Sequence, residues 1–236
     1  MIFDGDDTLW STEPLYDSAL AEMAALIGSM GVPPDEWLKL QRKIDLLNVQ
    51  VLGVSSVRFP VSSVQALVEI ARKYGIGIPQ SVATSVSEIA ESVFWTEAQV
   101  DTAAQSVLSD LAPYFSLVLL TKGDAAVQHR RLQQSGLESK FDFVWVVDEK
   151  DETHFGSLAA KFQSPRDQAW SIGNSAASDI NPALRAGMNA IWIDAHVWQH
   201  ERREEVVENQ LLVVLHSLSE VPDALLPTSR ETKMAL

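Results

Sequence analysis

The chain has no cysteine, few basic residues and no long apolar run, and each absence excludes a class of protein. Without cysteine there is no disulfide framework, no thiolate metal site and no thiol nucleophile. Only 18 Lys and Arg residues stand against 32 Asp and Glu, a net charge of -14, which disfavours nucleic acid or an anionic membrane as a partner. No stretch approaches the roughly 18 apolar residues of a membrane span, and Met1 to Phe3 is too short for the apolar part of a signal peptide. We therefore expect a soluble, cytoplasmic protein, with its oligomeric state left open.

Three carboxylates lie within four residues near the start of the chain: Asp4, Asp6 and Asp7. Each disfavours ionisation of its neighbours, so the cluster is costly unless a cation or a reaction uses it. The apolar pair Ile2-Phe3 before it predicts the end of a strand, although one with only two residues after Met1. The segment Thr8-Leu9-Trp10 after it predicts a return into structure.

Two other interpretations of this cluster were weighed against its spacing. A calcium loop of the EF-hand type needs glycine at its sixth position and glutamate at its twelfth. In a loop starting at Asp4 those positions are Leu9 and Leu15, which excludes that site. A solvated acidic turn stays possible on these residues alone.

The next hundred residues predict helices, because their apolar positions recur at spacings of three and four and Gly or Pro residues separate the segments. The expected helices run over about 14–27, 33–51, 62–74, 81–95 and 96–111.

The pattern changes after Pro113, where short apolar runs alternate with helical segments. Continuous apolar runs of four or five residues are typical of strands buried on both faces. The expected strands are 116–120, 143–147, 169–172 and 190–193, and the expected helices between them are 125–135, 152–162 and 179–186. This alternation predicts βαβ units in a doubly wound α/β fold with a parallel sheet.

Polar residues follow these strands, at the sheet edge where such folds bind ligands. Four strand ends with chemically matched groups favour a functional site over a chance acidic turn. The groups are Asp4 and Asp6, then Thr121 and Lys122, then Lys150, and finally Asn174, Ser178 and Asp179.

The order and spacing of these residues resemble those of the haloacid dehalogenase superfamily of hydrolases, of the phosphatase type with a helical cap. The segment Asp4-Gly5-Asp6-Asp7-Thr8 resembles the DxDxT signature, and Thr121 resembles the second motif. Lys150 matches the lysine of the third motif, and 173–179 resembles the fourth.

The resemblance implies a Rossmann-like α/β hydrolase core made of residues 1–13 and 112–227. It also implies a helical cap at 14–111, inserted after the first strand. The tail at 228–236 is expected to be disordered.

The implied activity is Mg²⁺-dependent hydrolysis of a small phosphorylated metabolite, a phosphomonoester. Asp4 is the implied nucleophile, which forms an aspartyl-phosphate and so splits hydrolysis into two easier steps. Asp6 is the implied general acid and then general base. Asp4, the Asp6 carbonyl and Asp179 are the implied metal ligands, and hard oxygen donors suit Mg²⁺.

Phosphoryl transfer depends on positioning and on stabilising charge. The Thr121 hydroxyl, the backbone N–H groups of Lys122 and Gly123, and the Lys150 ammonium suit that task. Lys161, at the end of a predicted helix, is the alternative to Lys150.

The fourth motif departs from the family at one position. Asn174 stands where many relatives carry Asp, which removes one charge from the surroundings of the metal. We expect a differently tuned metal affinity here, with Asn174 and Ser178 supporting the ligands.

Substrate choice is expected to depend on the cap. Arg58, in the predicted loop 53–59, is a candidate for binding a substrate anion, with a surface arginine as the equal alternative. Trp10 is a weaker candidate for lining the pocket, as are Tyr16 and Trp95, since aromatic residues at helical spacing are more often core.

Three other functions stay open. A phosphomutase shares all four motifs, and a non-catalytic metal-binding or ligand-binding descendant of the fold keeps them without turnover. A dehalogenase is less favoured, because carbon–halogen displacement does not need the acid/base that Asp6 supplies.

Overall fold

The computed structural model describes residues 1–194 and 204–226, and it divides the chain into two compact units. The first, here called the sheet unit, contains Met1–Ser11, Gln99–Thr121 and Leu132–Leu236. The second, here called the helical unit, contains Thr12–Ala98 and Lys122–Arg131. The predicted disordered tail at 228–236 lies outside the described residues.

The sheet unit is built on a six-stranded sheet in the order β5-β4-β1-β6-β7-β8. Counted along the chain, this is the strand order 3-2-1-4-5-6 of a doubly wound fold. The pairs of β1 with β4 and β6, of β6 with β7, and of β7 with β8 are parallel. The strands are β1 (Ile2–Phe3), β4 (Val118–Lys122), β5 (Phe143–Val147), β6 (Trp170–Gly173), β7 (Asn189–Ile193) and β8 (Leu212–Leu215).

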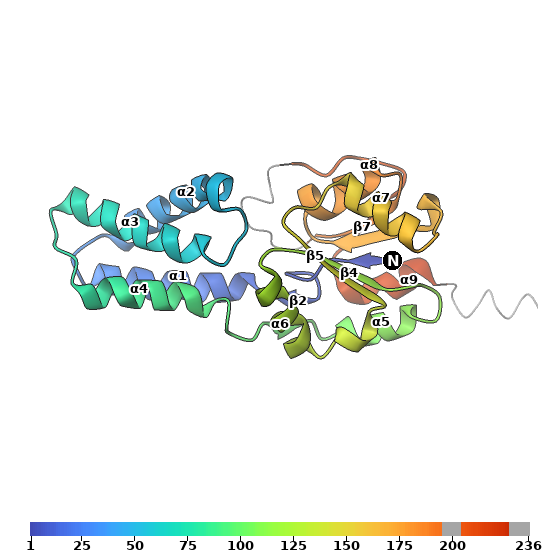
Figure 1. Cartoon of the computed structure of the whole chain (residues 1–236), viewed down its shortest axis with the longest axis horizontal. Helices are drawn as coiled ribbons and strands as arrows, with labels where there is room; N and C mark the ends of the chain where they lie inside the picture. The colour runs from blue at the N-terminus through green and yellow to red at the C-terminus, as the bar shows by residue number, and fades with distance from the viewer. Residues whose placement is uncertain (195–203, 227–236) are drawn as a thin grey trace, which may run out of the picture. The chain divides into compact units, whose positions relative to one another are not determined.

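Helices cover both faces of this sheet, with α7 and α8 on one side and α5 and α9 on the other (Figure 1). Their bounds are α5 (Ala104–Leu111), α7 (Glu152–Lys161), α8 (Asn181–Arg185) and α9 (Val221–Leu225). The predicted parallel, doubly wound α/β fold is confirmed.

The two-residue strand β1 lies in the middle of the sheet. Ile2 pairs with Val118 on one side and with Ser171 on the other, and the Asp4 N–H donates to the Ile172 carbonyl at 2.9 Å. Two partners therefore hold a strand that is too short to be stable alone.

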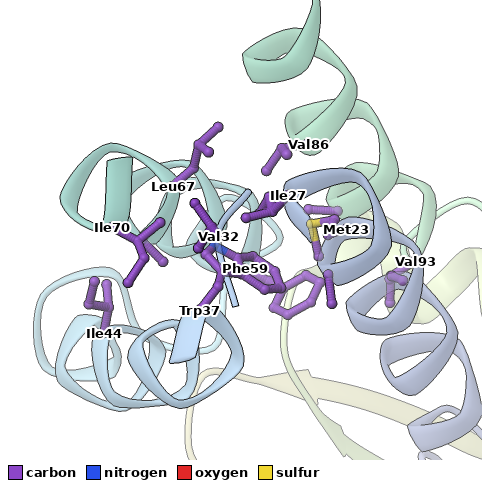
Figure 2. Packing of buried hydrophobic residues seen from close by; sticks show 14 of the residues in the cluster. Met23, Ile27, Val32, Trp37, Ile44, Phe59, Leu67, Ile70, Val86 and Val93 are labelled. Carbon is purple, nitrogen blue, oxygen red and sulfur yellow. The ribbon is translucent and has the colours of Figure 1, made fainter. Parts of the chain in front are cut away.

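The helical unit packs α1 (Glu13–Gly28), α2 (Pro34–Leu52), α3 (Arg58–Tyr74) and α4 (Gln80–Ser92) around one apolar core. Met23 and Ile27 of α1, Trp37 of α2 and Leu67 of α3 meet in this core, which Figure 2 shows from close by. The first turn of α6 (Ala125–Ser135) belongs to the same unit, with Val127 in the core.

Two boundaries differ from the sequence-based expectation. Residues 96–111 do not form one helix: Gln99–Val100 is a strand, β3, antiparallel to β2 (Trp10–Ser11), and α5 starts only at Ala104. The Asp101 carboxylate accepts the Ala103 N–H at 2.8 Å, a local turn that competes with a helix. Because α5 packs against α9, it groups with the sheet unit and not with the predicted cap.

The third helix also starts earlier than expected. Pro60 indicated a loop in the sequence, but it lies in the first turn of α3, where a missing N–H breaks no intrahelical bond. Arg58 is therefore a helical residue. Among the described residues, no helix combines the length and apolar character that a membrane span requires.

Candidate active site

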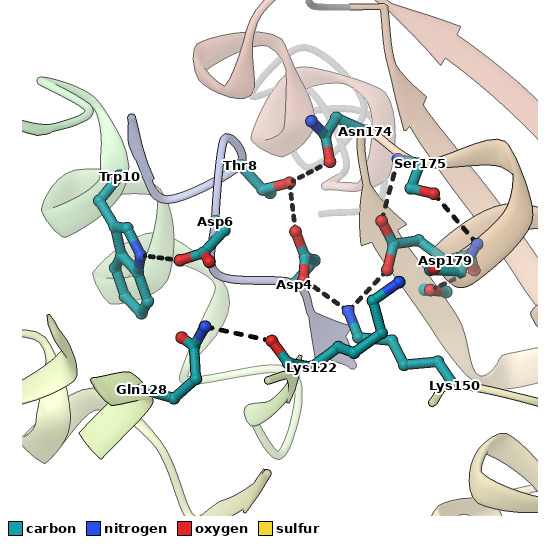
Figure 3. Close-up of polar contacts among 12 residues, drawn as sticks. Asp4, Asp6, Thr8, Trp10, Lys122, Gln128, Lys150, Asn174, Ser175 and Asp179 are labelled. Carbon is teal, nitrogen blue, oxygen red and sulfur yellow. Dashed lines mark hydrogen bonds and ion pairs between the residues drawn. The ribbon is translucent and has the colours of Figure 1, made fainter. Parts of the chain in front are cut away.

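The centre of the candidate site is a buried cluster of two carboxylates and one ammonium in the sheet unit (Figure 3). Lys150 Nζ lies 2.5 Å from Asp4 Oδ1 and 2.7 Å from Asp179 Oδ1. All three side chains are at least nine-tenths buried. Two negative charges thus share one positive charge in a place that water barely reaches.

Each member of this cluster comes from a different strand end. Asp4 directly follows β1, Lys150 lies three residues after β5, and Asp179 lies in the π-helical turn Ala176–Ile180 after β6. Such turns are rare and often occur at functional sites. The sequence predicted that these groups follow neighbouring strands, and the structure brings them into contact.

The loop after β6 is shaped around Asp179. The Ser175 N–H donates to Asp179 Oδ2 at 3.0 Å, and the Ser178 N–H donates to Ser175 Oγ at 3.1 Å. A Cβ on Gly173 would lie 2.4 Å from Asp179 Cγ, so only glycine leaves room for this carboxylate.

Electrostatics in the cluster follow from burial and from charge balance. Burial, and after it the charge of Asp179, raise the pKa of Asp4 to about 7, although the nearby Lys150 opposes this rise. Burial tends to lower the pKa of Lys150, but the charges of Asp179 and Asp4 outweigh burial and hold that pKa above its usual value. The cluster therefore keeps a surplus of negative charge that favours a further cation.

Thr8 links the first motif to the fourth. Its hydroxyl contacts Asp4 Oδ2 at 3.1 Å and Asn174 Oδ1 at 3.5 Å. Trp192 of β7 supports the same loop, because its indole N–H donates to the Asn174 carbonyl at 2.9 Å. Sequence analysis missed both supporting roles: Thr8 was recognised only as part of the DxDxT pattern, and Trp192 only as a packing residue.

Thr121 is 1% exposed, and its hydroxyl makes no hydrogen bond to any residue in the described ranges. A buried hydroxyl without a protein partner is costly. It is therefore suited to bind a group that comes from outside the chain.

The next two predicted phosphate-binding residues group with the helical unit. Lys122 ends β4 and Gly123 follows it; Gln128 Nε2 donates to the Lys122 carbonyl at 3.1 Å. In the same unit Ser56 Oγ donates to Asp124 Oδ2 at 2.8 Å, next to this turn. The roles of Lys122 and Gly123 toward a phosphate stay predictions.

The alternative lysine lies elsewhere. Lys161 is exposed, and its ammonium is 4.4 Å from the centroid of the Phe143 ring. Lys150, in contrast, contacts Asp4 directly.

Two predicted substrate contacts need correction. Arg58 is not in an open loop: it is 6% exposed, and its guanidinium lies 3.2 Å from Asp45 inside the helical unit. Trp10 is 1% exposed, and its indole N–H donates to Asp6 Oδ1 at 2.7 Å. Trp10 is thus a buried support of Asp6 and not an open pocket wall.

The donor set of the cluster was tested for its fit to Mg²⁺. No group of three or more His, Cys, Asp or Glu side chains that could hold a metal occurs among the described residues. Mg²⁺ does not need one, because it usually binds one or two carboxylates and fills its shell with water and phosphate oxygens. The carboxylates of Asp4 and Asp179, with the amide oxygen of Asn174 nearby, meet that requirement, and the surplus negative charge favours it.

The fold and the four strand ends define the class: the chain has the fold of the haloacid dehalogenase superfamily hydrolases. A haloacid dehalogenase-like hydrolase from Xanthomonas campestris aligns over 95% of this chain and 92% of its own, with a TM-score of 0.76 and 24% identity. A 2-haloacid dehalogenase from Pseudomonas syringae pv. Tomato aligns over 95% and 96%, with a TM-score of 0.60 and 24% identity. The HAD-hydrolase YfnB from Bacillus subtilis, bound to magnesium, aligns over 95% and 96%, with a TM-score of 0.65 and 20% identity.

Among curated proteins, the pyrimidine 5'-nucleotidase YjjG of Escherichia coli K12 is 26% identical over 124 residues. That match spans half of this chain and 54% of the relative, so it covers only about half of the nucleotidase. No family model matches the chain.

Proposed function

We propose that this protein is a Mg²⁺-dependent phosphatase that hydrolyses a small phosphomonoester through an aspartyl-phosphate on Asp4. The observation that carries the proposal is the buried Asp4–Lys150–Asp179 cluster with a second carboxylate, Asp6, two residues from the nucleophile. Nucleophile, cation and acid/base are then all provided by the ends of three strands.

In the first step, an Asp4 carboxylate oxygen forms a bond to phosphorus while the bond from phosphorus to the ester oxygen breaks. Asp6, protonated, gives its proton to the leaving oxygen, which departs as an alcohol. In the second step, the Asp6 carboxylate takes a proton from water, which attacks phosphorus and releases phosphate. Asp4 is thereby restored as a carboxylate.

Charge develops on the phosphoryl oxygens during both steps. The Lys150 ammonium and the otherwise unpartnered Thr121 hydroxyl are suited to stabilise that charge. Mg²⁺, held by Asp4, Asp179 and the Asp6 carbonyl, would supply the remaining positive charge and keep Asp4 ionised.

Asp6 favours phosphatase chemistry over dehalogenation. A halide leaves without a proton, so a dehalogenase needs no acid at this position, whereas an alkoxide leaves poorly unless it is protonated. Dehalogenases share this fold, which by itself does not distinguish the two reactions. A dehalogenase is therefore the second candidate, and a phosphomutase or a non-catalytic binding protein is the third.

The test is a panel of phosphomonoesters with Mg²⁺, with phosphate release as the readout. Pyrimidine nucleoside monophosphates come first in the panel, because of the partial match to a pyrimidine nucleotidase. We expect turnover that chelation of Mg²⁺ abolishes, and a loss of about 10³-fold or more in Asp4→Asn.

Each alternative predicts a different outcome. Halide release from 2-chloropropionate without phosphate release would establish the dehalogenase. Slow phosphate release with transfer between positions of a sugar phosphate would indicate a mutase. Binding of Mg²⁺ with no turnover of any ester would support the non-catalytic protein.

A further inference from the structure

The Trp10 side chain makes a directed contact with Asp6. Its Nε1–H donates to Asp6 Oδ1 at 2.7 Å, and the ring itself is 1% exposed while Asp6 is half-buried (Figure 3). An indole has one N–H donor and no acceptor. The contact therefore occupies one carboxylate oxygen and cannot compete for the proton that the other oxygen carries.

The backbone around the turn fixes this geometry. The Leu9 N–H donates to the Gly5 carbonyl at 2.8 Å, and the Asp7 N–H donates to the Trp10 carbonyl at 2.7 Å. A Cβ on Gly5 would lie 2.6 Å from Trp10 Cζ2, so the ring packs directly against a residue that has no side chain. The indole is thus held against the turn that carries Asp6.

A second strand holds the Trp10 backbone from the other side. Trp10 pairs with Val100 in the antiparallel β2–β3 ribbon, and the Asp101 N–H donates to the Leu9 carbonyl at 2.9 Å. All of these contacts lie within the sheet unit. A rigid donor at a fixed place restricts Asp6 to one orientation, and catalytic side chains need such support.

We propose that Trp10 is a positioning residue for the acid/base carboxylate of Asp6. It holds Oδ1 so that Oδ2 presents the proton to the leaving oxygen. This inference rests on the proposed phosphatase function and deepens it. Trp10 itself does not touch the reacting atoms and is not a catalytic residue.

The chain offers a matched control in Trp37. This tryptophan is also fully buried, in the helical unit, but its Nε1 makes no hydrogen bond to any residue that the structure describes. Trp37→Phe removes an indole N–H from a core without removing a contact to a carboxylate. Trp10→Phe removes the same atoms and also the contact to Asp6.

The experiment compares kcat/KM for two esters, an alkyl phosphate and p-nitrophenyl phosphate. The alkoxide needs a proton to leave, whereas p-nitrophenolate leaves without one, so only the first substrate depends strongly on an acid. For Trp10→Phe we expect kcat/KM to fall by about 10- to 100-fold on the alkyl ester and by less than about 3-fold on p-nitrophenyl phosphate. Trp37→Phe is expected to leave the ratio of the two values unchanged.

A double-mutant cycle and a spectrum supplement the kinetics. Trp10→Phe in the Asp6→Asn background is expected to add no further loss on the alkyl ester, because the carboxylate that it positions is gone. In a ¹H–¹⁵N spectrum of the wild type, the Trp10 indole N–H signal, assigned by its absence from Trp10→Phe, is expected to shift in Asp6→Asn. That measurement needs no turnover, so it tests the contact even when the phosphatase proposal fails.

Equal losses on both esters in a folded Trp10→Phe protein would overturn the inference and reduce Trp10 to a packing residue. An indole signal that ignores Asp6→Asn would overturn it as well, including the case in which Trp10→Phe does not fold. A wild-type protein that releases no phosphate from any ester contradicts the proposed function, which is a separate result.

Discussion

Each unit of this protein buries charged side chains, but the two units balance them differently. In the helical unit Arg58 of α3 faces Asp45 of α2 at 3.2 Å, one cation for one anion. In the sheet unit Lys150 alone faces both Asp4 and Asp179. The first arrangement is neutral, and the second carries an excess negative charge.

The difference shows which buried charges serve structure and which serve chemistry. Burial raises the pKa of Asp45 only in part, because the Arg58 charge opposes it. Burial and a second carboxylate together raise the pKa of Asp4 to about 7. A cluster that is left short of positive charge is prepared for a cation, and strongly perturbed carboxyls of this kind are typical of functional sites.

The largest predicted effect comes from removing the shared cation. Lys150→Met leaves two buried carboxylates facing each other, and we expect it to lower the free energy of unfolding by about 4 kcal/mol. Urea denaturation at pH 8 measures the loss, and added Mg²⁺ is expected to restore part of it. The exposed Lys161→Met serves as the control and is expected to stay within about 1 kcal/mol of wild type. Equal losses in the two variants would remove the distinction drawn above.

Removing the cation of the neutral pair is the next test. Arg58→Met is expected to cost about 3 kcal/mol at pH 8, because Asp45 stays buried without its partner. Asp45 has a raised pKa in the fold, so in its protonated form it favours the folded state, and that contribution is lost as the pH rises through the raised pKa. The variant is therefore expected to approach wild type at low pH and to fall behind as the pH increases. The same titration with Asp45→Asn in the Arg58→Met background is expected to be nearly flat; a slope there would assign the effect to another group.

An exposed carboxylate next to Lys150 in sequence provides a smaller effect of opposite sign in pH. Asp151 caps α7 by accepting the N–H groups of Thr153 at 2.9 Å and His154 at 3.2 Å. The hydrogen bond from the Thr153 hydroxyl, and then these backbone contacts, lower the pKa of Asp151 to about 2. We expect Asp151→Ala to cost about 1 kcal/mol at pH 7.

Because this pKa is lowered, the stability that Asp151 contributes is present above its ordinary value and is lost as the pH falls toward 2. Thermal unfolding of Asp151→Ala and wild type at pH 7 and pH 3 measures the difference, which is expected to shrink at pH 3. Asp148→Ala is the control, since Asp148 is exposed and precedes the cap. A difference that grows at pH 3 would contradict the capping role.

The smallest effect is expected when both members of the neutral pair are replaced together. Asp45→Leu with Arg58→Met leaves no uncompensated charge, and such replacements are often neutral or stabilising. We expect the free energy of unfolding to stay within about 1 kcal/mol of wild type and phosphate release to persist. A large loss of phosphate release in this folded double variant would give Arg58 a role in the reaction after all.

The sheet was largely predictable because its strands are written as short apolar runs. Strands β4 to β7 were expected within a few residues of their observed bounds, since strands buried on both faces need continuous apolar sequence. β8 was not predicted, although Leu211 to Leu215 is such a run. The strands β2 and β3 escaped because two residues each are too few to show a period.

The carboxylates and the lysine of the site were predictable because parallel strands bring their ends to one edge. What the sequence could not show is the direction of individual side chains. The contact of Trp10 with Asp6 depends on a turn in which Asp7 adopts a left-handed φ of 60° and Gly5 leaves room for the ring. Arg58 was misplaced for a related reason, because Pro60 marks a loop or a first helical turn equally well.

The pairing of β1 also determines when the site can form during folding. Its two residues gain partners only from Val118 and Ser171, both far downstream, so loop closure over most of the chain precedes any stable strand there. Local helices can form long before that. Asp4 is among the first residues to be synthesised, but it becomes a positioned nucleophile only after β4 and β6 have emerged and folded, so the chain gains its reactive centre as a late event of its own maturation.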